Sequence, residues 1–144
     1  MTELHFTPRP ELRALIMAEG IERVDHAHGF EIRAERMNSS WQGFIDGYIK
    51  IPIGHPWFGL GYDAEELSGV EVHGGLTYAN SELRTPEGYI AGWWLGFDTA
   101  HAGDLSPSVD GHNFSGDTYK DMEFVMSELV NLARQAKEAT DNVQ

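Results

Sequence analysis

Two short segments of the chain carry most of the residues whose types could perform chemistry. The first is Val72–Thr77, with the sequence VHGGLT, and the second is Trp94–Asp104, with the sequence WLGFDTAHAGD. Each places His, Asp or Thr beside glycines at the end of a run typical of a β-strand. Side chains can converge there, and a ligand can approach the backbone closely. We therefore expect the functional site at these two segments.

The second segment holds two carboxylates and an imidazole within seven residues, at Asp98, His101 and Asp104. Together with His73 they could form a two-His, two-carboxylate cage for a divalent metal, because imidazoles suit zinc and related ions. Alternatively, Asp98 orients His101, which then acts as a general acid or base. A purely structural interpretation is also open, in which Asp98 caps the turn and His101 packs beside the adjacent strand.

The glycine pair after His73 also has two interpretations. Gly74 and Gly75 indicate either a bulge that redirects His73 or a backbone packed closely beneath the last helix. Alternation along a strand would put His73 and Thr77 on one face, where they could bind phosphate or ribose oxygens. The same two residues would equally suit a solvent-exposed face.

Other residues could complete a ligand site. Trp41 and Trp57 lie beside loops, and stacking of a base on such a ring contributes about 1–3 kcal/mol. His55 could reach the site, although Gly-His-Pro favours a tight turn whose His bonds to backbone. Arg36 is the first candidate for binding an anion, with a surface ion pair as the alternative.

Composition limits the class of protein. A chain of 144 residues with 41% hydrophobic residues predicts one domain spanning 1–144, with residues 140–144 prone to fraying. A net charge of −13 disfavours duplex nucleic acid and anionic membranes as partners. The absence of Cys excludes disulfides and thiolate catalysis and is compatible with the cytoplasm. No apolar run approaches the roughly 20 residues of a membrane span.

Periodicity predicts an α+β fold in which an antiparallel sheet of about four strands is covered by a short N-terminal and a long C-terminal helix. The loop Pro52–Gly69 and a turn at Thr85–Gly88 separate the later strands. Asp117 is the expected N-cap of the last helix. The expected helices are about Pro10–Glu19 and Thr118–Ala139, and the expected strands are about Phe30–Met37, Trp41–Ile51, Val70–Tyr78 and Tyr89–Phe97.

Three stretches together resemble a family of small phage and prophage proteins: Gly47–Pro56, Val72–Thr77 and Gly96–Asp104. The closing Tyr119–Val125 is similar to the terminal helix of that family, so the resemblance spans roughly Trp41 to Val125. Lys50 and Thr99 depart from the family pattern, so neither is expected to be essential to a shared activity. The resemblance implies a phage setting, and hence the host cytoplasm, but little chemistry.

The expected function is that of a small phage-type protein that binds and sequesters a nucleotide-like molecule, working as a homo-oligomer. In a phage setting, the ligand would be a host immune signal such as a cyclic ADP-ribose type molecule or a cyclic dinucleotide. The first alternative is a phosphodiesterase-type hydrolase that uses His73 and His101, with or without a divalent metal. The second is an acidic inhibitor that binds a host protein. No catalytic residue follows from the sequence alone.

Overall fold

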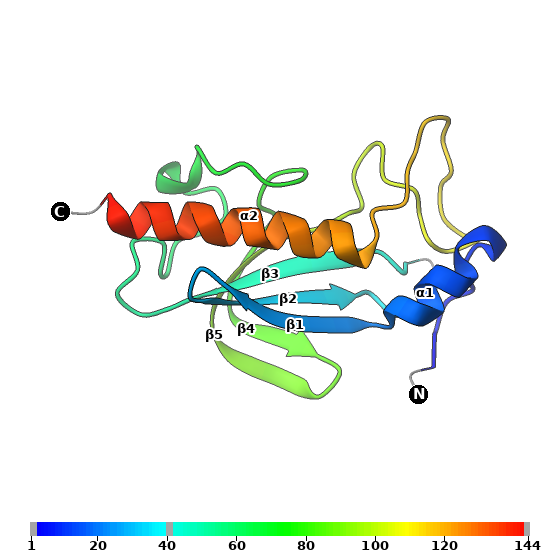
Figure 1. Ribbon diagram of the computed structural model, residues 1–144, viewed down its shortest axis with the longest axis horizontal. Helices are drawn as coiled ribbons and strands as arrows, with labels where there is room; N and C mark the ends of the chain where they lie inside the picture. Colours follow the sequence, from blue (N-terminus) through cyan, green and yellow to red (C-terminus); the bar gives the residue numbers. More distant parts are fainter. Residues whose placement is uncertain (1–2, 40–41, 143–144) are drawn as a thin grey trace.

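A five-stranded antiparallel sheet is the centre of the fold (Figure 1). The computed structural model describes residues 3–39 and 42–142. The spatial order of the strands is β1-β2-β3-β5-β4. The predicted α+β class is therefore confirmed, with five strands rather than about four. The strands are β1 (Glu22–Ala27), β2 (Phe30–Arg36), β3 (Ile45–Ile51), β4 (Tyr78–Thr85) and β5 (Gly88–Phe97).

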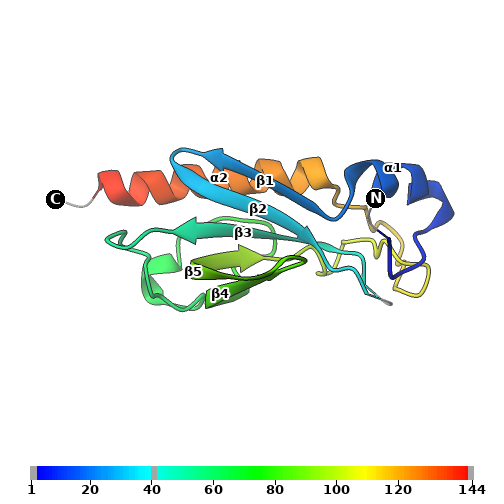
Figure 2. The same ribbon diagram turned by 90° about the horizontal axis from the view of Figure 1, so that it is seen from below.

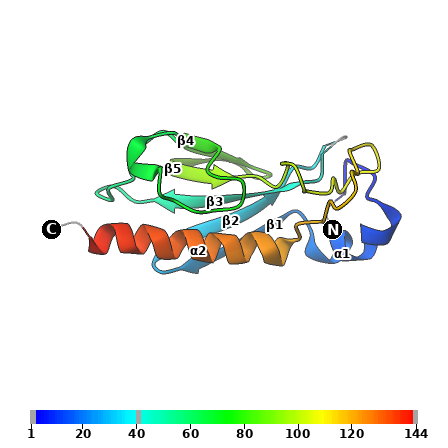
Figure 3. The same ribbon diagram turned by 90° about the horizontal axis from the view of Figure 1, so that it is seen from above.

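The long helix α2 (Met122–Asp141) covers one face of the sheet and packs against β1, β2 and β3 (Figures 2 and 3). Its apolar residues recur at helical spacing, so one stripe faces the sheet as the sequence predicted. Full burial of each large side chain in this stripe contributes about 1.5–3 kcal/mol. The buried residues are Met122, Val125, Leu129, Leu132, Ala133 and Ala136.

The opposite face of the sheet carries a smaller apolar cluster of Tyr48, Leu83 and Trp94. Trp94 is fully buried there, whereas its neighbour Trp93 packs against the main core and donates from Nε1 to the carbonyl of Leu60 at 3.1 Å. Adjacent strand residues point to opposite faces, so alternation along β5 explains this division of the two tryptophans.

The N-terminal helix begins with a 3-10 turn, η1 (Pro10–Leu12), and continues as α1 (Arg13–Glu19). It ends at Gly20, whose φ of 74° favours glycine. Figure 1 shows α1 beside the start of α2. The Glu19 carboxylate joins the two helices, because its Oε2 accepts a hydrogen bond from the Met122 amide at 2.7 Å.

Two expectations about the strands were wrong. Strand β1 was not predicted, because it is an edge strand of mostly exposed residues without an apolar alternation. The expected strand Val70–Tyr78 is instead a loop followed by β4, with a short 3-10 turn η2 (Glu65–Leu67) preceding it. Gly74 and Gly75 have φ values of 69° and 81°, which interrupt the extended backbone of a strand.

Boundaries of the other elements also shift. Strand β3 starts at Ile45 rather than near Trp41, which lies outside the described residues. Helix α2 starts at Met122, and Asp121 is its N-cap, accepting from the Phe124 amide at 2.8 Å. Asp117 instead accepts from the Phe114 amide within the preceding loop. No helix in the described part of the chain is long and apolar enough to cross a membrane.

A buried acid on β2 makes the stability of this fold depend on pH. Glu35 is paired across the sheet with Glu22 of β1 and is 6% exposed. Burial, followed by the neighbouring Glu22 carboxylate, raises the pKa of Glu35 to about 9, although the Arg33 guanidinium opposes this shift. The folded chain therefore holds a proton that the unfolded chain releases above its ordinary pKa of 4.5.

The stabilising contribution of this proton is complete below pH 4.5 and is lost as the pH rises to about 9. The slope from this single group is at most about 1.4 kcal/mol per pH unit. We predict that Glu35→Gln removes this slope, so the variant gains stability relative to the parent as pH increases from 5 to 9. Urea unfolding at several pH values measures the effect.

Glu31→Gln is the matched control for this experiment. Glu31 lies on the same strand, but its carboxylate accepts a hydrogen bond from Arg33 Nε at 2.7 Å. Removing that charge should leave stability at high pH unchanged or lower it. Equal pH slopes for Glu35→Gln and the parent protein would contradict the assignment to Glu35.

Candidate functional site

The loop that carries His73 is attached to the side of α2 by hydrogen bonds from the helix. Gln135 both accepts from the Glu71 amide at 2.8 Å and donates to the Glu71 carbonyl at 2.6 Å. Glu128 accepts from the His73 amide at 2.7 Å. The His73 ring then packs edge-on against Phe124, with centroids 5.2 Å apart. Polar side chains of α2 therefore fix the position of His73 without a strand.

The other half of the site is a turn that follows β5. Thr99 anchors its start, because its buried hydroxyl donates to the Ile45 carbonyl at 2.9 Å. The Asp104 amide donates to the His101 carbonyl at 2.9 Å and closes the turn. Asp104 also forms an isolated bridge with Thr118, which lies ahead of α2. These backbone contacts direct the Asp104 carboxylate into the protein.

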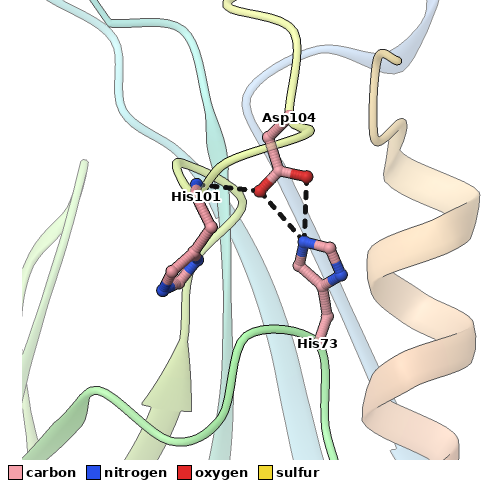
Figure 4. A group of neighbouring side chains, drawn as sticks. All are labelled: His73, His101 and Asp104. Atoms are coloured by element: carbon pink, nitrogen blue, oxygen red, sulfur yellow. Dashed lines mark hydrogen bonds and ion pairs between the residues drawn. The ribbon is translucent and has the colours of Figure 1, made fainter. Parts of the chain in front are cut away.

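His73, His101 and Asp104 converge where the loop and the turn meet (Figure 4). His73 Nε2 lies 2.9 Å from each carboxylate oxygen of Asp104, and the His101 amide donates to Asp104 Oδ2 at 2.9 Å. One possible ligand atom from each residue lies within 4.8 Å of those of the other two. Within residues 3–39 and 42–142, this is the one group of at least three such residues that could hold a metal ion.

Asp104 is the buried centre of this group, with a side chain only 1% exposed. Burial alone would raise the pKa of its carboxyl group. Hydrogen bonds from His73, the His101 amide and Lys120 outweigh burial, so the pKa of Asp104 is lowered. Lys120 Nζ lies 3.1 Å from Asp104 Oδ1. The carboxylate therefore remains charged in the folded protein and is available as a metal ligand.

Asp98 lies behind His101 rather than in the group itself. Its Oδ1 is 3.0 Å from His101 Nδ1, and its Oδ2 accepts from the Thr77 hydroxyl at 3.0 Å. The contact with His101 lacks the orientation of a hydrogen bond, so the buried Nδ1 has no hydrogen-bond partner among the described residues. Burial, and after it the nearby Asp98 carboxylate, raises the pKa of Asp46 to about 7, although a hydrogen bond from Tyr48 opposes this shift.

Gly74 lets the two segments approach each other closely. A Cβ atom at Gly74 would lie 2.6 Å from the His101 ring, whereas one at Gly75 would meet nothing within 4 Å. The two glycines therefore have different roles. Gly74 provides the space that the His101 ring occupies, and Gly75 serves the turn alone.

A cavity of about 210 Å³ adjoins the same turn. We call His73, His101 and Asp104 the His-Asp group. His101 and Asp104 also line the cavity, whereas His73 does not. The two imidazole side chains are 20% and 35% exposed, so a small molecule or ion can reach them. The wall is completed by Phe44, Ala100, Ala102, Gly103, Ser106, His112, Phe114 and Asp117.

Three further candidates from the sequence lie away from this group. The Arg36 side chain is fully buried and donates to Gly20, Gly43, Glu19 and Tyr119. His55 is a buried turn residue, with Nδ1 accepting from the Trp57 amide at 2.9 Å and Nε2 lying 2.8 Å from the Ala136 carbonyl. Trp57 packs in the core beside it, 5% exposed. We do not include these residues in the proposed site.

The sequence predicted that His73, Asp98, His101 and Asp104 lie near one another, as their distances show, but it missed several neighbours. Lys120 is a lone cation in a polar stretch, and no spacing linked it to Asp104. Phe114 and His112 belong to an irregular loop, which gave them no predicted face. The Asp98-x-x-His101-x-x-Asp104 pattern was the one usable signal, and long-range packing decides which of its carboxylates meets His73.

Comparisons of the chain with protein-family models, with curated proteins and with solved structures found no match.

The close fit between Gly74 and His101 yields a prediction about metal affinity. Both Gly74→Ala and Gly75→Ala place a side chain at positive φ, at a cost of about 1–2 kcal/mol. Only the added methyl group at Gly74 displaces the His101 ring. We therefore expect Gly74→Ala to weaken Zn²⁺ binding at least about tenfold relative to Gly75→Ala, as loss of ligand positioning does elsewhere.

Isothermal titration of each variant with Zn²⁺ measures this difference, and circular dichroism confirms that both are folded. Equal Zn²⁺ affinities in the two folded variants would show that the position of His101 does not matter for metal binding.

Proposed function

We propose that this protein is a metal-dependent hydrolase acting on a small nucleotide-like phosphodiester. The observation that carries the proposal is the convergence of His73, His101 and Asp104, whose donor atoms lie within 4.8 Å of one another beside a cavity. Two imidazoles and one carboxylate suit Zn²⁺ or a related transition metal. Three protein ligands also leave a coordination position open, which is typical of catalytic rather than structural zinc sites.

The surroundings of the three residues support a metal centre. Metal-bound histidines commonly donate their second ring N–H to a carboxylate, and Asp98 Oδ1 lies 3.0 Å from His101 Nδ1, so a rotation of the ring is all that this bond requires. The lowered pKa of Asp104 keeps that ligand ionised. Asp98 is therefore a positioning residue in this proposal. The sequence suggested a metal cage of four ligands, whereas the proposed site has three ligands and one supporting carboxylate.

The reaction would be hydrolysis of a phosphodiester bond. Water adds to phosphorus as a P–O bond of the linkage breaks, and the proton released by the water goes to the leaving oxygen. That oxygen belongs to an alcohol in a cyclic dinucleotide and to a phosphate in a cyclic ADP-ribose isomer. A metal held by His73, His101 and Asp104 would supply Lewis acidity and would lower the pKa of the attacking water. Lys120 Nζ lies 3.1 Å from Asp104 Oδ1, so a positive charge, the kind that binds phosphate, stands beside the proposed metal ligand in an otherwise acidic protein.

Capture without cleavage is the second candidate function. It is favoured because Asp104 already contacts His73, the His101 amide and Lys120. These partners satisfy the carboxylate without a metal. The same cavity would then hold a nucleotide-like ligand through hydrogen bonds. In a phage setting such a ligand would be a host immune signal, and capture by a homo-oligomer in the host cytoplasm would remove it.

Product analysis distinguishes the two functions. The purified protein is incubated with cyclic dinucleotides and cyclic ADP-ribose isomers, with Zn²⁺ or Mn²⁺ added or with chelator, then heated and analysed by chromatography. We predict metal-dependent linear products, reduced at least about 100-fold in His101→Ala because a ligand is lost. Asp110→Asn, which changes an exposed residue outside the group, should retain full activity.

Release of intact ligand in every condition would contradict hydrolysis and support capture. Absence of both binding and cleavage across the panel would contradict both functions and favour the acidic-inhibitor alternative, which a pull-down from host lysate tests.

A further inference from the structure

Two aromatic rings are stacked on each other at the protein surface, on the loop that follows the turn with His101 and Asp104. The rings of His112 and Phe114 are nearly parallel, at 13°, with centroids 5.3 Å apart. Phe114 is 67% exposed, although it is a large apolar side chain. An exposed aromatic ring held in a fixed stack offers a flat surface to a ligand.

Hydrogen bonds to the backbone hold this pair in place from both sides. Arg9, only 9% exposed, donates from Nη2 to the His112 carbonyl at 3.2 Å and to the Gly111 carbonyl at 3.0 Å. The Phe114 amide donates to Asp117 Oδ2 at 2.9 Å. The backbone on both sides of the stack is therefore ordered before any ligand arrives, which lowers the entropy cost of binding.

The stacked pair shares a cavity with two residues of the proposed metal site. His112 and Phe114 line the same cavity of about 210 Å³ as His101 and Asp104, with Phe44 on the wall. Sites for drug-sized ligands are usually about 300–1,000 Å³, so this one is large enough for a single ring system but not for a whole nucleotide. The rest of such a ligand must extend outside the cavity.

We propose that the His112–Phe114 pair is the base-binding subsite, on which a nucleobase stacks while its sugar-phosphate extends toward His101 and Lys120. This inference rests on the proposed function for the direction of the phosphate, but the stacking surface is independent of any metal. The subsite restricts the substrate class to phosphodiesters that carry a nucleobase. It also replaces Trp41 and Trp57, which the sequence favoured for this role.

The test compares AMP with ribose 5-phosphate, which has the same sugar and phosphate but no base. Isothermal titration should show that AMP binds the parent protein at least about tenfold more tightly. Phe114→Ala should abolish this preference while leaving the affinity for ribose 5-phosphate unchanged. Phe114→Trp, which retains a flat ring, should keep it.

Tyr89→Ala is the matched control, because Tyr89 is 68% exposed and lies on the β4–β5 hairpin, outside the cavity wall. It should leave both affinities unchanged. Equal affinity for AMP and ribose 5-phosphate, a preference that survives Phe114→Ala, or no binding of either probe would overturn the base-binding subsite.

The outcomes also separate this inference from the hydrolase proposal. A Phe114-dependent preference for AMP in a protein that neither binds Zn²⁺ nor cleaves any substrate would retain the subsite and reject the hydrolase. Zn²⁺-dependent cleavage without any preference for AMP would retain the hydrolase and reject the subsite.

Discussion

The arrangement of the site follows from one buried carboxylate, that of Asp104, which requires hydrogen-bonding and charged partners. A charged group at 1% exposure is costly unless hydrogen bonds and opposite charges replace the lost water. Its partners come from three segments: His73 from the loop on α2, the His101 amide from the turn after β5, and Lys120 from the stretch before α2. The carboxylate thus connects the His73 loop, the turn after β5 and the stretch before α2 at one point.

The sheet makes this meeting possible by bringing the ends of two strands together. Tyr78 at the start of β4 pairs with Gly96 near the end of β5, and the Thr77 amide donates to the Gly96 carbonyl at 2.9 Å. The loop before β4 and the turn after β5 must therefore be neighbours. Helix α2 completes the site, because its apolar stripe packs on the sheet while its polar side chains bind the His73 loop.

Elements with a strong local pattern could be predicted from the sequence, and those defined by distant contacts could not. The antiparallel sheet and the long C-terminal helix followed from periodicity. The meeting of the two polar segments was also predicted, but through a strand that the positive φ angles of Gly74 and Gly75 prevent. Proximity was right although the local structure was wrong, because β4 begins just beyond the glycines.

The sequence could not show which polar side chains are buried and which remain free to bind a ligand. Arg36 looked available for an anion, but its guanidinium is enclosed by carbonyls and Glu19 that lie far away in sequence or on other elements. Asp98 and Asp104 were equivalent in the pattern, and only the fold places Asp104 beside His73 and Asp98 behind His101. Phe114 showed no periodicity, although its exposure and stacking make it the flat surface beside the site.

The most direct test of the metal centre is a crystal structure of the protein grown with Zn²⁺, with diffraction data collected on both sides of the zinc absorption edge. The proposal predicts an anomalous peak within about 2.0–2.2 Å of one nitrogen each of His73 and His101 and an oxygen of Asp104. A map with no zinc peak at these residues, and with His73 and Lys120 still bonded to Asp104, would contradict it.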